Sequence, residues 1–109
     1  MLAFEKLDVY RAAIEFRAVV NRIGKGANRE LRDQIDRASS SVVLNIAEGA
    51  GRWLGPDKRR FYQIARGSAC ESAAVLDCLS VDGVIGEGDY EKAGQLIQRV
   101  ISMLTRLCK

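Results

Sequence analysis

The sequence contains no histidine and only three cysteines among its 109 residues. Histidine is the commonest general base and metal ligand near neutral pH, so its absence argues against most acid–base and metal-dependent enzymes. Cys70, Cys78 and Cys108 are odd in number and form no CxxC pair, which indicates neither a disulfide framework nor a zinc site. We therefore predict a protein without enzymatic activity, metal or cofactor, and we expect its cysteines to be buried thiols in a reducing cytoplasm.

Long apolar runs are also missing from the sequence. No uninterrupted apolar stretch approaches the roughly 18 residues that a membrane-spanning helix needs, and the charges from Glu5 onward do not fit a signal peptide. We therefore expect a cytoplasmic protein that makes no contact with a membrane. Its length predicts a single domain, residues 1–109. The core of so small a domain is marginal, and oligomerisation would add to its stability.

Apolar residues recur at helical spacing in four segments of the chain. These run from about residue 5 to 23, from 29 to 48, from Gly55-Pro56-Asp57 to the Asp82-Gly83 pair, and from 89 to the end. The fourth is apolar around most of its circumference, which predicts cover on more than one side, including by a neighbouring subunit. With no strand-like alternation, the sequence predicts the all-α class, as an up-down-up-down four-helix bundle. The stripe expected to be buried in the third segment is Phe61, Ile64, Ser68, Ser72, Val75 and Leu79.

A polar row borders the apolar stripe of the second segment, where Gln34, Ser41, Asn45 and Glu48 share one flank. On the third segment, a mid-helix glycine at Gly67 costs about 1 kcal/mol relative to alanine. We expect close packing of another helix at Gly67 to compensate for this cost. One interpretation of these polar residues is a hydrogen-bonded network that fixes helix register or subunit contacts. The other is a ligand or catalytic site formed by Asn45, Glu48, Arg66 and Glu71, with the two glutamates as paired carboxylates.

Positive charge is concentrated between Gly49 and Arg66, where five cations face one acid, Asp57. Trp53 lies among the cations, and Tyr62 is predicted to share a helical face with Arg59 and Arg66. Arginine with exposed aromatic side chains is typical of phosphate contact combined with base stacking. The alternative is a solvated helix face with a buried tryptophan anchor. The five cations are Arg52, Lys58, Arg59, Arg60 and Arg66.

Three blocks of the sequence resemble a known protein family. They are Leu31-x-Asp33-Gln34-x-x-Arg37-Ala38, then Asn45-Ile46-Ala47-Glu48-Gly49, and then Phe61 followed by Ile64-Ala65-Arg66-Gly67-Ser68-x-x-Glu71. They are similar to a family of small bacterial four-helix bundles that includes proteins encoded in intervening sequences of 23S ribosomal RNA genes. The accessory variability determinant of diversity-generating retroelements belongs to the same fold group. The resemblance covers essentially the whole chain.

The resemblance implies a four-helix protomer that assembles into a ring-like homopentamer and has no enzymatic activity. It also implies binding to nucleic acid, or docking to a reverse transcriptase, through a positively charged surface. The chain departs from the family where a serine- and arginine-rich loop is common, because its own loop is Arg52-Trp53-Leu54-Gly55-Pro56. We interpret the residues of the matching blocks first as a structural network, formed by Gln34, Asn45, Glu48, Gly67, Ser68 and Glu71.

Two hypotheses about function follow from these observations. The first is a non-enzymatic, oligomeric bundle that binds structured RNA or a ribonucleoprotein, because a ring of subunits would add the fields of its basic clusters. The second is a protein–protein adaptor, such as an accessory subunit of a reverse transcriptase, suggested by the wide apolar face of the fourth segment. In the first hypothesis Trp53 stacks on a base, and the phosphate contacts come from Arg52, Lys58, Arg59, Arg60 and Arg66.

Overall fold

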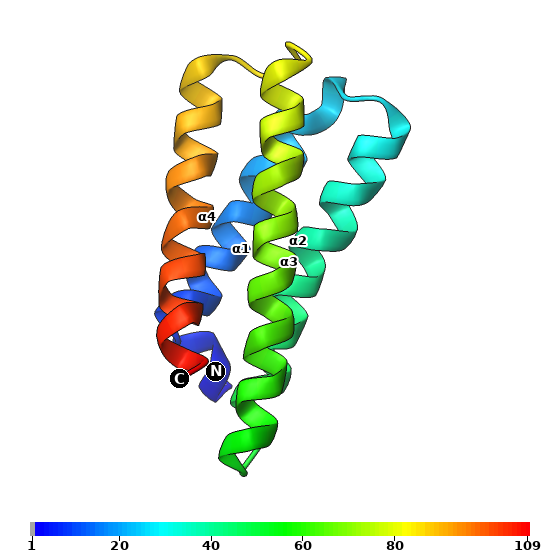
Figure 1. Cartoon of the computed structure of the whole chain (residues 1–109). Helices are drawn as coiled ribbons and strands as arrows, with labels where there is room; N and C mark the ends of the chain where they lie inside the picture. Colours follow the sequence, from blue (N-terminus) through cyan, green and yellow to red (C-terminus); the bar gives the residue numbers. More distant parts are fainter. Residues whose placement is uncertain (1) are drawn as a thin grey trace.

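The computed structural model describes residues 2–109 as a bundle of four antiparallel α-helices (Figure 1). The helices are α1 (Asp8–Ile23), α2 (Arg29–Ala50), α3 (Gly55–Val81) and α4 (Glu87–Leu107), with 3-10 turns at η1 (Ala3–Lys6) and η2 (Gly24–Gly26). The described residues contain no strand, and the bundle measures 44 × 22 × 22 Å. None of the described helices combines the length and the hydropathy required to cross a membrane. The predicted all-α fold with four helices is confirmed, whereas the pentameric ring stays a prediction.

Local sequence signals set the ends of these helices. Asn28 caps α2, because its side-chain oxygen accepts a hydrogen bond of 2.9 Å from the backbone N–H of Leu31. Pro56 lies in the first turn of α3, where a missing N–H leaves no helical bond unmade. Gly83 has a φ of +73° in the α3–α4 turn, a left-handed conformation that favours glycine. The first predicted segment is divided at Leu7, which is extended between η1 and α1.

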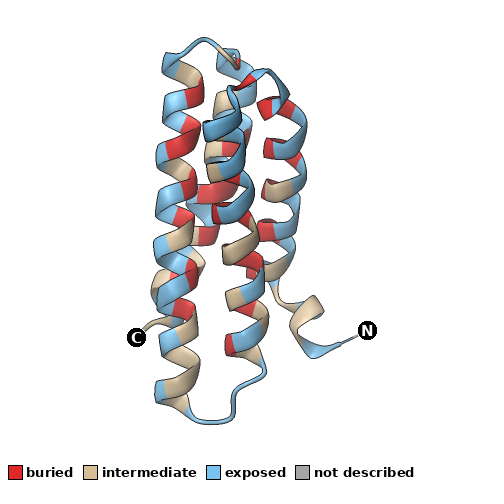
Figure 2. Ribbon diagram, turned by 90° about the vertical axis from the view of Figure 1, so that its right-hand side faces the viewer, coloured by how far each residue is buried: buried red, intermediate tan, exposed pale blue. Residues whose placement is uncertain are grey.

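The four helices enclose one core, and the buried residues face inward along each of them (Figure 2). Burying a side chain as large as leucine or phenylalanine is worth about 1.5–3 kcal/mol. The core therefore holds the helices together and fixes where their surface residues lie. Its largest fully buried side chains are Phe16 from α1, Ile46 from α2, Leu76 and Leu79 from α3, and Leu104 from α4.

The buried stripe of α3 differs from the predicted one in its first half. Tyr62 and Ala65 are buried, whereas Phe61 is half-buried and Ile64 is 43% exposed. The stripe is rotated by about one residue, so Tyr62 is a core residue and the prediction of an exposed aromatic beside Arg59 is wrong. Periodicity did not separate the two registers, because apolar residues at 61, 62, 64 and 65 fit both of them.

The apolar breadth of α4 is largely covered within the single chain. This helix packs against both α1 and α3. The two neighbours together account for most of its apolar circumference, so these residues do not require a neighbouring subunit for their burial. Leu107, in the last turn, is 39% exposed. The buried residues of α4 are Ala93, Leu96, Ile97, Val100 and Leu104.

The cysteines are less buried than their residue type predicts. Cys70 and Cys78 are exposed, and Cys108 is half-buried just beyond α4. The prediction of buried thiols is therefore wrong for Cys70 and Cys78. Both residues lie outside the buried stripe of α3, which contains their sequence neighbours Ala69 and Leu79.

Candidate functional site

A short polar seam joins α2 to α3, where the polar row of the sequence was interpreted as either a hydrogen-bonded network or a ligand site. The hydroxyl oxygens of Ser41 and Ser68 lie 2.7 Å apart across the two helices. The side-chain amide of Asn45 donates to the Ser41 carbonyl at 2.9 Å and to the Ser41 hydroxyl at 3.1 Å. Ser72 donates its hydroxyl proton to the Ser68 carbonyl at 2.9 Å. These bonds occupy the seam with internal partners, which suits a device that fixes the register of α2 and α3.

The other members of the predicted network do not join this seam. Glu48 pairs with Arg52 at 3.0 Å, and half-buried Gln34 makes no side-chain hydrogen bond within residues 2–109. Gly67 and Glu71 are exposed on α3, and no atom lies within 4 Å of a Cβ placed on Gly67. The prediction of close helix packing at Gly67 is therefore wrong.

The close contact between α2 and α3 occurs at Gly49 instead. A Cβ placed there would lie 2.8 Å from Cε1 and 2.9 Å from Cδ1 of the Tyr62 ring. Both residues are buried, so the ring fills the space that a side chain at residue 49 would need. This contact fixes the end of α2 against the beginning of α3, on either side of the loop of residues 51–54.

The ring of Phe61 contacts two of the predicted basic residues, Arg52 and Arg60. The guanidinium carbons of Arg52 and Arg60 lie 4.6 and 4.8 Å from the centre of its ring, a cation–π arrangement. Asp57 lies 3.8 Å from Arg52 and 3.7 Å from Arg60, and Glu48 also pairs with Arg52. Two carboxylates therefore accompany these two guanidinium groups and reduce the local positive charge.

Lys58 is engaged with the end of α2. Its ammonium group donates to the backbone carbonyls of Gly49 at 3.1 Å and Ala50 at 3.0 Å. These carbonyls belong to the last turn of α2, where unpaired acceptors and the negative end of the helix dipole favour a cation. Two of its three donors are occupied in this way, so Lys58 is better placed to hold the helix end than to contact a ligand.

Arg59 and Arg66 lie seven residues apart on the flank of α3 that faces α4. The Nε–H of Arg66 donates to the Thr105 hydroxyl at 2.8 Å, and that hydroxyl donates to the Ile101 carbonyl at 2.7 Å. The charge of Arg66 also reaches Cys108, whose pKa is raised by burial and partly lowered again by this arginine. Within residues 2–109, no carboxylate lies within 4.0 Å of either arginine. Their charges are therefore not neutralised locally.

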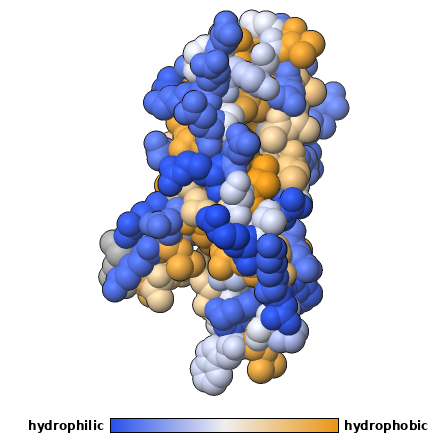
Figure 3. Space-filling model, turned by 60° about the vertical axis from the view of Figure 1, so that its left-hand side comes forward, coloured by the Kyte–Doolittle hydropathy of each residue, from blue (hydrophilic) through white to orange (hydrophobic). Residues whose placement is uncertain are grey.

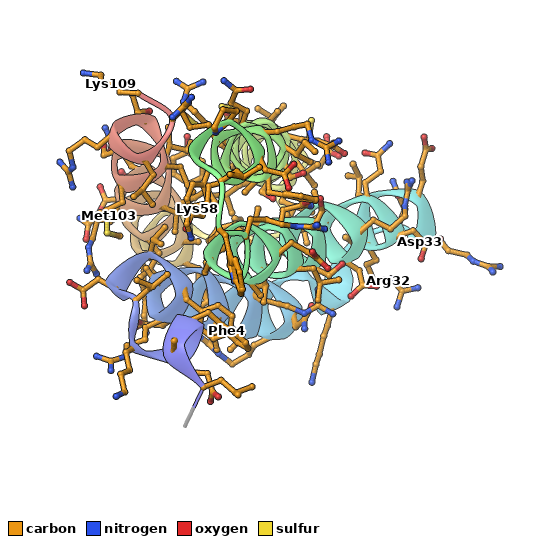
Figure 4. The ribbon with its side chains drawn as sticks, turned by 90° about the horizontal axis from the view of Figure 1, so that it is seen from below. Phe4, Arg32, Asp33, Lys58, Met103 and Lys109 are labelled. Carbon is orange, nitrogen blue, oxygen red and sulfur yellow. The ribbon has the colours of Figure 1, made fainter. Side chains whose placement is uncertain are left out.

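Antiparallel packing adds cations from α4 that sequence reasoning missed. No Asp or Glu follows Glu91, and Arg99, Arg106 and Lys109 are all exposed. Arg99 and Arg106 line one shallow hollow on the outward side of α4. Figure 4 looks onto this end of the bundle, with Lys109 at its periphery and Lys58 nearer the middle. We use the term α3–α4 basic surface for five cations toward this end of the hairpin: Arg59 and Arg66 on α3, Arg99 and Arg106 on the outward side of α4, and Lys109 just beyond it.

Charge is segregated along the α3–α4 hairpin. Residues 67–91 contain six acids and no Lys or Arg, whereas residues 92–109 contain four cations and no acid. Because the helices run antiparallel, the acidic residues gather toward the α3–α4 turn and the basic ones toward the C-terminus, at the opposite end in Figure 1. The absence of acids after Glu91 was the signal that could have revealed this arrangement from the sequence.

Trp53 lies in the loop between α2 and α3, next to Arg52 in the sequence. Its side chain is 97% exposed, and that of the adjacent Leu54 is 72% exposed. The alternative of a buried tryptophan anchor is therefore wrong. The end of the bundle that carries the basic residues thus also displays an uncovered indole.

Comparisons with known proteins agree with the fold. A sequence model of the family described as 23S rRNA-intervening sequence protein matches residues 5–106. The crystal structure of a protein with unknown function from the S23 ribosomal protein family, from Bacteroides thetaiotaomicron VPI-5482, is similar with a TM-score of 0.83 and 24% sequence identity. The similarity covers 93% of this chain and 98% of that one, and at this identity it establishes the fold alone. No curated protein matches the chain.

Proposed function

Because this chain belongs to the family of 23S rRNA-intervening sequence proteins, we propose that it is a non-enzymatic, oligomeric bundle that binds structured RNA or a ribonucleoprotein. The single observation that carries the proposal is the α3–α4 basic surface. Four of its five cations come from α3 and α4 and the fifth, Lys109, follows α4; within residues 2–109 none of them has a carboxylate within 4.0 Å. Such a surface can neutralise phosphates and release their counterions, the main source of affinity for nucleic acid.

The basic residues differ in how far carboxylates or carbonyls of the protein already engage their charged groups. The α3–α4 basic surface makes the principal phosphate contacts. Arg52 and Arg60 contribute less, because Asp57 and Glu48 already share their charge. Lys58 holds the end of α2. In a ring of subunits, as in the predicted homopentamer, the same surface would recur at each position and the fields would add.

A matched pair of double variants tests this proposal. Arg99→Gln with Arg106→Gln removes two exposed charges from the α3–α4 basic surface. Arg22→Gln with Arg32→Gln removes two exposed charges near the opposite end of the bundle and serves as the control. Binding to a fluorescent RNA hairpin is followed by anisotropy over a range of salt concentrations. The first variant should flatten the slope of log affinity against log salt by about 0.7–0.9 for each lost phosphate contact.

The control variant should keep the slope of the wild-type protein. Equal weakening by both variants would show that net charge alone matters and would contradict the assigned surface. Binding that does not respond to salt, or no binding to RNA at all, would contradict the proposed function itself.

A second candidate function is a protein–protein adaptor, such as an accessory subunit of a reverse transcriptase. It is favoured by apolar side chains near the end of α2, where 63%-exposed Leu44 and half-buried Phe4 line a shallow hollow with Ala47. A pull-down from the native host, with and without nuclease, tests it. A protein partner that stays bound after nuclease treatment supports the adaptor, and loss of every protein partner counts against it.

A further inference from the structure

We infer that Trp53 stacks on an unpaired nucleobase of the bound RNA, so that the protein selects RNA with loops, bulges or open ends over continuous duplex; this rests on the proposed function. The starting observation is the 97% exposure of the indole, the highest among the large exposed hydrophobic side chains. Isolated exposed apolar residues are common, but an uncovered tryptophan offers a large aromatic face to a ligand. Figure 3 shows a hydrophobic group beside one of intermediate hydropathy at the lower tip of the molecule, below a hydrophilic surface.

The loop that carries Trp53 is held at both ends. On the α2 side, the backbone N–H of Gly51 donates to the carbonyls of Ala47 and Glu48, and that of Arg52 donates to Gly49. On the α3 side, the backbone N–H of Lys58 donates to the Leu54 carbonyl at 3.0 Å. The Lys58 side chain closes the same loop onto α2. The indole is therefore presented from an anchored turn, which lowers the conformational entropy lost when a base stacks on it.

The charges around the loop favour a polyanion over an apolar protein surface. Near the loop, Arg52 and Arg60 share the carboxylates of Glu48 and Asp57. Within residues 2–109, Arg59 has no carboxylate within 4.0 Å, so its positive charge is not neutralised. Cations beside an exposed aromatic side chain are the combination by which proteins hold single-stranded nucleic acid, through backbone phosphates and base faces. Leu54, 72% exposed beside the indole, adds an apolar contact for the same base or its sugar.

The exposed position of the Trp53 side chain indicates which RNA structures it can contact. In a continuous A-form duplex the base faces are covered by neighbouring bases, and the deep major groove cannot be read by side chains. An indole at the tip of a loop can reach a base face only where stacking is interrupted. The α3–α4 basic surface contacts phosphates in either kind of RNA, so Trp53 supplies the discrimination between them.

The test compares a hairpin that has an unpaired loop with a blunt duplex of the same phosphate count. The wild-type protein should bind the hairpin about 5- to 150-fold more tightly, the contribution expected from one stacked base. Trp53→Ala should abolish this preference, and Trp53→Phe should keep part of it. Val81→Ala, at an 86%-exposed apolar position at the far end of α3, is the control and should keep the preference. Trp53 is the single tryptophan of the chain, so its fluorescence should be quenched by the hairpin and unchanged by the duplex.

The outcomes separate this inference from the function on which it rests. Salt-dependent binding of both RNAs with equal affinity, unaffected by Trp53→Ala, would overturn the inference and leave the proposed function standing. Fluorescence that does not change when the hairpin binds would overturn it as well. Absence of binding to either RNA would remove both the proposed function and the inference.

Discussion

The ring of Tyr62 packs against Gly49 so closely that a Cβ at residue 49 would lie 2.8 Å from its Cε1 atom. This relationship joins the last turn of α2 to the second turn of α3, and both residues are buried. The ring can occupy this buried position because residue 49 has no side chain, since a larger residue there would meet the ring.

The contact between Gly49 and Tyr62 predicts an unusual contrast between two glycine substitutions. Gly49→Ala should lower the free energy of unfolding by about 1–3 kcal/mol, the usual cost of overpacking a core. Gly67→Ala, also in a helix but in open space, should raise it by up to about 1 kcal/mol through helix propensity. Urea unfolding followed by circular dichroism measures both. Equal effects of the two substitutions would contradict the packing described for Gly49.

Lys58 is predicted to contribute to stability more than other lysines. Lys58→Met should lower the free energy of unfolding by about 0.5–1.5 kcal/mol, because two carbonyls of α2 lose their donor. Lys92→Met, at an exposed position of α4, is the control and should change stability by less than about 0.5 kcal/mol. Indistinguishable unfolding curves for the two variants would show that the Lys58 hydrogen bonds have no net value.

Stability at high pH should depend on Tyr62, since burial raises the pKa of its phenol. The pKa of this phenol in the folded protein lies above its value in the unfolded chain, and the unfolded value is about 10. This contribution is therefore fully present below about pH 10 and is lost as pH rises through the raised pKa of the folded protein. The difference in unfolding free energy between the wild-type protein and Tyr62→Phe should stay level up to about pH 9 and turn against the wild type above about pH 10. A level difference up to about pH 11 would contradict the raised pKa.

The predicted homopentamer is tested by light scattering after size-exclusion chromatography at low and high salt. A pentamer should have a mass of about 60 kDa, five times the 12.0 kDa of one chain, and should carry no nucleic-acid absorbance. A stable monomer at both salt concentrations would rule out the ring. It would also remove the summed field of several basic surfaces from the argument for RNA binding.

Features set by local sequence could be predicted, and features set by contacts between helices could not. The Asn28 cap and the Pro56 start of α3 are encoded within a few residues, so the helices were found with small errors at their ends. The burial of Tyr62 was missed, because it depends on a glycine that precedes it by a whole loop. A helical stripe read from one segment contains no information about the shape of its partner.

The candidate site was predictable only in part for the same reason. The cations from Arg52 to Arg66 are close in sequence, but Arg99 and Arg106 come to the same half of the molecule only through the antiparallel packing of α4 on α3. Conversely, Lys58 was predicted to contact phosphate, but its ammonium group donates hydrogen bonds to the backbone carbonyls of Gly49 and Ala50. Counting charges in a window therefore located a group of cations but did not show which of them are paired with carboxylates or occupied by backbone carbonyls.

The segregation of charge along the hairpin has a consequence for how the protein meets a partner. Six acids toward one end of the α3–α4 hairpin and cations toward the other give the hairpin a dipole along the length of the 44 × 22 × 22 Å body. In the field of a polyanion this dipole produces a torque that turns the molecule before contact, so that a larger share of diffusional encounters occurs end-on. Rotation of the protein during its diffusional approach then increases the association rate, independently of the strength of the final contacts.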